Sequence, residues 1–142
     1  MIKRKVTEAF IIKTIIMERT IFYTENAPKP VGPYSQAVLA GKTLYISGQI
    51  PINPATNTLI DVDITLATKQ VMENIGAILA EAGMDFSNVV KCTIFVTDMA
   101  KFKDVNAVYF NYFEESFPAR ETVQVSALPM TAMVEISAIA VL

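Results

Sequence analysis

Residues 63–83, DITLATKQVMENIGAILAEAG, decide the fold prediction because they contain a clear helical repeat. Their apolar residues recur at intervals of three and four, which places them in one stripe along a helix. Asp63 is a suitable N-cap, and Gly83 stands where a left-handed residue commonly follows a helix. The stripe consists of Ile64, Ala67, Val71, Ile75, Ile78 and Ala82. The stretch therefore predicts a long amphipathic helix.

Short strands are expected before this helix. Residues 21–23, 36–40 and 43–48 are predicted strands, because Pro and Gly turns separate them, with a tight hairpin turn at 41–42. Residues 51–62 contain two prolines and two asparagines, which indicates a loop.

The chain after the helix predicts three strands and a second helix. Residues 89–96, VVKCTIFV, are β-branched and aromatic and predict a central strand. A helix is expected over 102–115, closed by Pro118, and strands over 122–127 and 134–141. The resulting order, ββ(β)αβαββ, predicts an α+β fold with the helices on one face of a sheet.

The first 16 residues differ from the rest of the chain. Their basic start and apolar stretch are interrupted by Lys13, no small-residue cleavage site follows, and the stretch is too short to span a membrane. Glu8 and the absence of Ser disfavour a targeting peptide, so an extension without a role, or sequence upstream of a start at Met17, is favoured. We expect residues 17–142 to form a single domain.

Residue usage excludes several kinds of site. The chain has no histidine, which excludes Ser-His-Asp triads, histidine bases and histidine zinc sites. Cys92 is the only cysteine, so disulfides and paired-cysteine redox motifs are excluded as well. Five dispersed glycines form no nucleotide-binding loop. We therefore expect no metal, no cofactor and a reducing, cytoplasmic location.

Charge and hydropathy indicate the kind of partner. The net charge is −2, and the one basic cluster is at residues 3–5, so nucleic acid is not an expected partner. Hydrophobic residues make up 52% of the chain and charged residues 18%, so we expect part of the apolar surface to lie between subunits.

Arg120 and Glu135 are the candidate reactive side chains. Arg120 follows a rigid Pro-Ala corner, which suits bidentate capture of a carboxylate; the alternative is a surface ion pair with Glu121 or a neighbour. Glu135 lies in an otherwise apolar strand, where burial would raise its pKa, unless its face is solvated or intersubunit. If Thr122 pairs with Glu135 across antiparallel strands, Glu135 shares a face with Arg120.

A third candidate region combines residues 32–36 with residues 46–51. Gly48 is positioned there to expose a backbone N–H to an anion. The alternative interpretation is that the Gly-Pro segment is only a turn.

Five motifs occur in order along the chain: TENAP at 24–28, GPYSQA at 32–37, SGQIP at 47–51, FPAR at 117–120 and VEISAIAV at 134–141. Together they resemble the Rid family, the reactive intermediate deaminases, also known as YjgF, perchloric-acid-soluble or endoribonuclease L-PSP proteins. The resemblance covers residues 21–142. It implies a chorismate-mutase-like (YjgF-like) mixed sheet with two helices packed on one face, in a homotrimer with clefts between the subunits.

The resemblance also implies an activity. Such a protein hydrolyses 2-imino or enamino acids, such as 2-iminobutanoate and 2-iminopropanoate, to 2-keto acids and ammonia without a metal or cofactor. Pyridoxal-phosphate-dependent dehydratases release the enamines, which is the functional link that the resemblance implies. Arg120 is expected to bind the substrate carboxylate, and Glu135 to position the attacking water. The residues expected to line the cleft are Tyr34, Ser47, Gly48, Asn106 and Thr122.

One position departs from the family pattern. Many deaminase members carry cysteine where this chain has Thr122, and Cys92 lies on a different strand and does not replace it. The departure puts substrate range and susceptibility to thiol modification in doubt.

Two alternatives remain. One is a non-catalytic trimer that binds small carboxylates; Glu135 argues against it, because binding alone needs no water-activating carboxylate. The other is an endoribonuclease or translation inhibitor, which the acidic charge and the absence of histidine disfavour. Phe102, Phe110, Met130 and Met133 are expected in the core or at the cleft.

Overall fold

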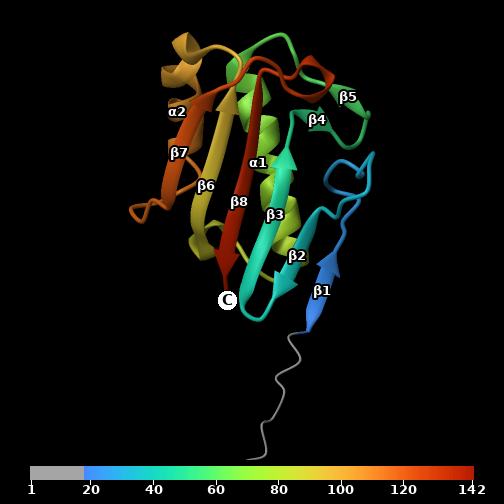
Figure 1. Cartoon of the computed structure of the whole chain (residues 1–142). Coiled ribbons are helices and arrows are strands. Elements are labelled where there is room, and N and C mark those ends of the chain that lie inside the picture. The colour runs from blue at the N-terminus through green and yellow to red at the C-terminus, as the bar shows by residue number, and fades with distance from the viewer. Residues whose placement is uncertain (1–17) are drawn as a thin grey trace, which may run out of the picture.

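A mixed six-stranded sheet carries two helices on one of its faces (Figure 1). The computed structural model describes residues 18–142, so the predicted extension and the start at Met17 lie outside the described residues. In spatial order the strands are β1 (Arg19–Phe22), β2 (Ala37–Ala40), β3 (Thr43–Gln49), β8 (Val134–Val141), β6 (Val89–Val96) and β7 (Ala119–Gln124). The helices are α1 (Ile64–Glu81) and α2 (Phe102–Phe110). The predicted α+β class is confirmed.

The long helix forms with the caps that the sequence predicts. Asp63 Oδ1 accepts the backbone N–H of Leu66 at 3.0 Å. Gly83 follows the helix with φ +71°, a left-handed value that glycine adopts without strain. Val71 and Ile75 have no exposed surface, so the predicted apolar stripe faces the core.

Other predicted boundaries are wrong. The loop predicted over 51–62 contains a small hairpin, β4 (Ile52–Asn53) with β5 (Thr58–Leu59), which Asn57 closes in a left-handed conformation. The second helix ends at Phe110 instead of 115, because short-range turns follow and draw Phe113 into the core. β7 begins at Ala119, three residues earlier than predicted.

The pairing of Thr122 with Glu135, which would have placed Glu135 on the face of Arg120, does not occur, because β6 lies between β7 and β8. β6 and β7 run parallel, since the connection through α2 crosses back over the sheet before β7 begins. β6 and β8 run antiparallel, with Phe95 opposite Glu135.

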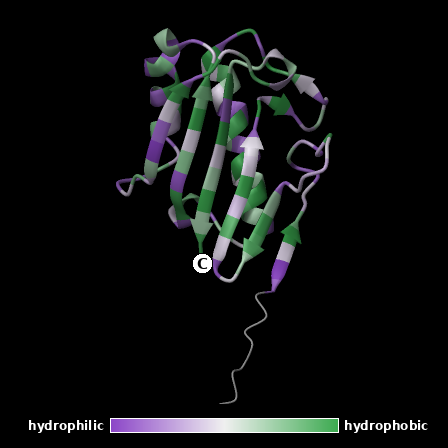
Figure 2. Ribbon diagram, in the orientation of Figure 1, coloured by the Kyte–Doolittle hydropathy of each residue, from purple (hydrophilic) through white to green (hydrophobic). Residues whose placement is uncertain are grey.

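Only one face of the sheet is covered by helices. Val134, Ile136, Ala138 and Ala140 of β8 alternate into the core beneath α1. Figure 2 shows hydrophobic residues along the central strands. The opposite face also carries large apolar side chains, in particular Tyr45, Phe95, Val123 and Ile139. Residues 18–142 of a single chain therefore leave apolar sheet surface without a covering layer.

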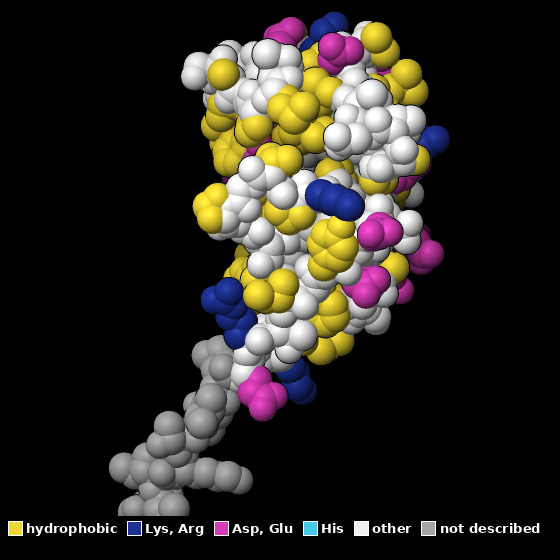
Figure 3. Space-filling model, turned by 90° about the vertical axis from the view of Figure 1, so that its right-hand side faces the viewer, with side chains coloured by type: hydrophobic (Ala, Val, Ile, Leu, Met, Phe, Trp, Pro, Cys, Tyr) yellow, Lys and Arg dark blue, Asp and Glu magenta, His cyan; other side chains and the backbone are white. Residues whose placement is uncertain are grey.

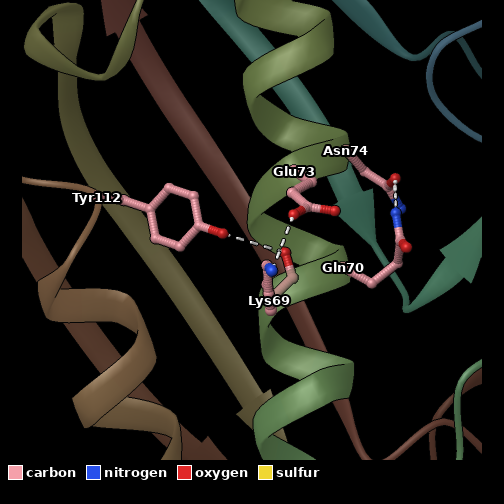
Figure 4. A network of polar contacts seen from close by, with 5 residues as sticks. All are labelled: Lys69, Gln70, Glu73, Asn74 and Tyr112. Atoms are coloured by element: carbon pink, nitrogen blue, oxygen red, sulfur yellow. Dashed lines mark hydrogen bonds and ion pairs between the residues drawn. The ribbon is translucent and has the colours of Figure 1, made fainter.

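A polar network fixes α1 to the loops on either side of it (Figure 4). Gln70 donates to Asn74 at 2.9 Å, and buried Asn74 donates to the carbonyls of Ile50 and Ile52 at 3.3 and 3.0 Å. On the other side, the hydroxyl of Tyr112 reaches the Lys69 carbonyl at 3.4 Å. The network thereby anchors the 50–52 segment, which borders the site described next.

Candidate active site

Arg120 is held against α2. Its Nη1 donates to Asn106 Oδ1 at 2.6 Å, and its Cζ lies 5.0 Å from the ring centroid of Tyr109 and 5.5 Å from that of Phe102. The three partners are spaced by four and three residues, so they project from one side of the helix. Aromatic rings and one amide oxygen therefore orient the guanidinium.

The guanidinium has no carboxylate partner among residues 18–142. The alternative interpretation was a surface ion pair, with Glu121 as its first candidate partner. Glu121 instead accepts a hydrogen bond from Thr93 at 2.8 Å and forms an ion pair with Lys91 at 3.2 Å. Those contacts lower the pKa of Glu121, with the Thr93 hydrogen bond as the largest cause. The ion-pair alternative is thus wrong in this structure, and Arg120 keeps N–H groups for an external anion.

A hollow of about 420 Å³ opens beside this cation. We call it the Arg120 pocket, and its lining residues are Asn106, Tyr109, Phe110, Phe117, Pro118 and Arg120. Aromatic walls around an unpaired planar cation suit a small carboxylate, because they shield the charge-assisted hydrogen bonds from water.

The second group of candidate residues meets at a β-bulge. Ile46 of β3 pairs with Ala138 and Gln49 pairs with Ile136, so Ser47 and Gly48 together oppose one residue of β8. Bulges of this kind are common beside active sites, where they redirect side chains. The hydroxyl of Ser47 donates a hydrogen bond to the backbone carbonyl of Ser35 at 2.6 Å, and this bond holds the 32–36 loop against the bulge.

Glu135 extends over this bulge. A Cβ added at Gly48 would collide with Oε1 of Glu135 and lie 2.8 Å from its Cδ, so the carboxylate occupies the space that the missing side chain leaves. Burial raises the pKa of Glu135, and no Lys or Arg among residues 18–142 forms an ion pair with it. A carboxylate of this kind is suited to take and return a proton.

A second hollow, of about 340 Å³, opens beside Glu135. We call it the Glu135 pocket. Its lining residues are Pro28, Lys29, Val31, Tyr34, Gln36, Ser47, Gly48, Gln49, Ile50, Ile52, Pro129, Met130 and Glu135. The predicted residues Tyr34, Ser47, Gly48 and Glu135 therefore come together.

The two pockets lie on opposite faces of the sheet. Arg120 is in register with Cys92 of β6, whose side chain is buried on the helix-covered face. Glu135 is in register with Phe95 on the other face. Because β6 separates their strands, the two backbones are also roughly 10 Å apart across the sheet. The condition under which Arg120 and Glu135 would share a face is therefore not met within one chain.

Thr122 and Cys92 lie on the Arg120 side of the sheet. The Oγ1 atom of Thr122 is buried and has no hydrogen-bond partner among residues 18–142, and the same holds for the hydroxyl of Tyr109. Thr122 lines neither of the two pockets. Cys92 is 1% exposed, and burial raises the pKa of its thiol.

Several residues at the two pockets had no clear sequence signal. Tyr109 was missed, although its spacing from Asn106 on a predicted helix favoured a shared side. Of the residues expected in the core or at the cleft, Phe102 contacts Arg120, Met130 lines the Glu135 pocket, and Met133 packs on the core.

The surface adds little support for other ligands. Within residues 18–142, no three Cys, Asp or Glu side chains converge as metal ligands, and no helix is long and apolar enough to cross a membrane. On the face seen in Figure 3, Lys and Arg side chains are dispersed among uncharged and hydrophobic ones.

Comparisons with known proteins find similar sequences and structures. Residues 24–142 match the sequence family described as Endoribonuclease L-PSP. Protein DfrA of Myxococcus xanthus is 54% identical, over 88% of this chain and 97% of its own. The bovine 2-iminobutanoate/2-iminopropanoate deaminase is 51% identical, over 87% of this chain and 90% of its own. The crystal structure of YyfA from Yersinia pestis, a Rid-family protein of unknown function, superimposes with a TM-score of 0.86 at 48% identity, over 88% of this chain and all of that one.

Proposed function

Because this chain belongs to the endoribonuclease L-PSP family, which includes the Rid proteins, we propose that it hydrolyses 2-imino acids to 2-keto acids and ammonia. The substrates proposed first are 2-iminobutanoate and 2-iminopropanoate. The deaminase name of the bovine relative supports this choice. Two side chains carry the proposal. Arg120 forms no ion pair among residues 18–142, and Glu135 is a half-buried carboxylate whose pKa is raised by burial.

The active unit is a homotrimer, in which the Arg120 pocket of one subunit faces the Glu135 pocket of the next. Two features support this arrangement: the pockets lie on opposite faces of one sheet, and residues 18–142 of one chain leave an apolar sheet face uncovered. A head-to-tail contact repeated around a threefold axis joins two different surfaces and closes on itself. Each trimer then contains three equivalent clefts.

Substrate binding begins at the carboxylate. Arg120 donates to it the N–H groups that are not bonded to Asn106, while the aromatic rings of α2 keep the guanidinium in place. The imine carbon, C2, then lies toward Glu135 of the neighbouring subunit. Fixing both groups in one cleft supplies the proximity that the reaction needs.

Hydrolysis then requires two proton transfers in each direction. Glu135 takes a proton from water as the water oxygen attacks C2, and it returns this proton to nitrogen, which receives the C=N electron pair. Glu135 then takes the hydroxyl proton of the tetrahedral carbinolamine and delivers it to nitrogen, so that the C–N bond breaks, ammonia leaves and the C=O bond forms. Positioned acid–base catalysis of this kind contributes about 10²–10⁴-fold, which suffices for an imine that also reacts with water unaided.

The chemistry also indicates the source of the substrate. Pyridoxal-phosphate-dependent dehydratases release enamines that tautomerise to these imines, so we propose that the protein acts on their products. A cytoplasmic location is also proposed, because the single cysteine, Cys92, suits a reducing compartment.

Trapping of residual imine tests the proposal. A threonine dehydratase generates 2-iminobutanoate, semicarbazide captures what remains, and the parent protein is compared with Arg120→Ala and with the exposed control Arg19→Ala. We expect the parent and Arg19→Ala to lower semicarbazone formation equally, and Arg120→Ala to lose about a hundredfold in kcat/KM. Unchanged semicarbazone formation with folded parent protein would refute deamination. Equal activity of Arg120→Ala would refute the role of the arginine.

The same preparations separate the alternatives. A non-catalytic carboxylate-binding trimer would bind 2-oxobutanoate through Arg120 without altering semicarbazone formation. A nuclease would cleave RNA at a rate that Glu135→Gln or Arg120→Ala changes.

A further inference from the structure

Two consecutive residues beside the Glu135 pocket have left-handed backbones. Met130 has φ +55° and Thr131 has φ +59°. Such values are uncommon outside glycine, and for a β-branched residue such as Thr131 they are strongly disfavoured. Strained backbone of this kind persists where the surrounding structure fixes it, and it concentrates at functional sites.

The neighbouring residues hold this turn from both sides. Pro129 precedes it, and its carbonyl accepts the N–H of Ala132 at 3.1 Å. Ala132 is buried, and the carbonyl of Met133 accepts from Thr97 of the loop after β6 at 3.1 Å. The left-handed pair therefore directs Met130, which is 55% exposed, into the wall of the Glu135 pocket.

Most of the remainder of that wall is apolar. Besides Lys29 and the polar groups near the bulge, it consists of Pro28, Val31, Ile50, Ile52, Pro129 and Met130. If the carboxylate is bound by Arg120 of the neighbouring subunit and C2 faces Glu135, the substituent on C2 is left to contact this wall. A hollow of about 340 Å³ exceeds what a methyl or ethyl group fills.

We propose that Met130 determines substrate specificity, and that the cleft prefers 2-imino acids with aliphatic or thioether side chains of three or four heavy atoms over 2-iminopropanoate. This inference rests on the proposed function. Each methylene buried against the wall is expected to raise kcat/KM by about fourfold. The imines derived from leucine and methionine are therefore better substrates than the imine derived from alanine, by tenfold or more.

The test uses an L-amino acid oxidase to generate imines from alanine, leucine and methionine, with semicarbazide trapping to measure their removal. Met130→Ala is expected to lower kcat/KM about fivefold for the leucine and methionine imines, and less than twofold for the alanine imine. Met130→Leu retains the preference. Thr131→Gly is the control, because it relieves the backbone strain of the same turn without changing a residue that lines the pocket.

The outcomes separate this inference from the proposed function. If the parent removes none of the imines, the deaminase function fails. If it removes the alanine imine at least as fast as the leucine imine, or if Met130→Ala lowers all rates equally, deamination stands and the specificity role is overturned. Val31→Ala is a second variant of the wall; its side chain is 88% exposed, so folding is preserved and a selective loss for the larger imines is expected.

Discussion

The carboxylate of Glu135 lies against the backbone of Gly48, at the bulge in β3. Only glycine leaves room for the carboxylate in this position, because a Cβ at residue 48 would collide with Oε1 of Glu135. The bulge, the glycine and the glutamate therefore form one unit. Together they place a carboxylate whose pKa is raised by burial over the backbone of the bulge.

Gly48→Ala should separate catalysis from stability. The colliding atoms are the far end of a flexible side chain, so Glu135 can rotate away and the fold should lose only about 1 kcal/mol. Catalysis should fall about a hundredfold, because displacement of a reactive group by 1 Å has effects of that size. Imine trapping and thermal unfolding measure the two effects. Gly32→Ala is the matched control, since its nearest contact would be an ordinary 3.6 Å to Tyr34; an equal loss in both variants would contradict the account.

Glu135→Gln should raise the thermal midpoint at neutral pH while abolishing activity. Burial raises the pKa of Glu135 in the folded state, so the ionised side chain destabilises the fold at every pH above that raised value. The penalty disappears as pH falls toward the ordinary carboxyl pKa, and the two proteins should then unfold at the same temperature. A midpoint of the variant below that of the parent at neutral pH would show that the charge is stabilised instead. In the parent, kcat should fall on the acid side as Glu135 is protonated.

Substitutions at Tyr109 should distinguish the contribution of its ring to substrate binding from that of its hydroxyl. The ring lies 5.0 Å from the Arg120 guanidinium, whereas the hydroxyl has no partner among residues 18–142. Tyr109→Phe should therefore retain KM within about twofold, and Tyr109→Leu should raise KM about tenfold with a smaller change in kcat. Steady-state kinetics on folded trimers measure both. Equal losses in the two variants would assign the effect to the hydroxyl.

Thr122→Val should stabilise the protein by about 1 kcal/mol, because it replaces a buried hydroxyl without a partner by a methyl group of similar size. Urea unfolding provides the measurement. Thr93→Val is the comparison, since the Thr93 hydroxyl donates to Glu121 at 2.8 Å and its loss should destabilise by about 0.5 kcal/mol. Destabilisation by Thr122→Val would mean that a water or a neighbouring subunit satisfies this hydroxyl in solution.

The sequence predicted the elements whose local signals agree. α1 has an apolar stripe, an N-cap at Asp63 and a left-handed Gly83, and the strands at Val89–Val96 and Val134–Val141 are β-branched and have the predicted bounds. The end of α2 was misplaced because the following residues remain helix-compatible, and only the tertiary packing of Phe113 ends the helix.

The site was predicted as a set of residues but not as an arrangement. The motifs identified Arg120 and Glu135, yet the faces they occupy depend on the parallel pairing of β6 with β7, which the α2 crossover imposes. The bulge at Gly48 carries no distinctive local signal, because glycine is also common in ordinary turns. The left-handed backbone of Met130 carries none either, because no glycine stands at that position.

Mixed trimers of Arg120→Ala and Glu135→Ala test the central claim, that each cleft combines Arg120 of one subunit with Glu135 of another. Each variant alone should be inactive. When equal amounts are unfolded and refolded together, about one quarter of the clefts should receive both intact residues, and activity should return to about that fraction of the refolded parent. Mixed trimers that form but remain inactive would contradict the account and place both groups in one chain.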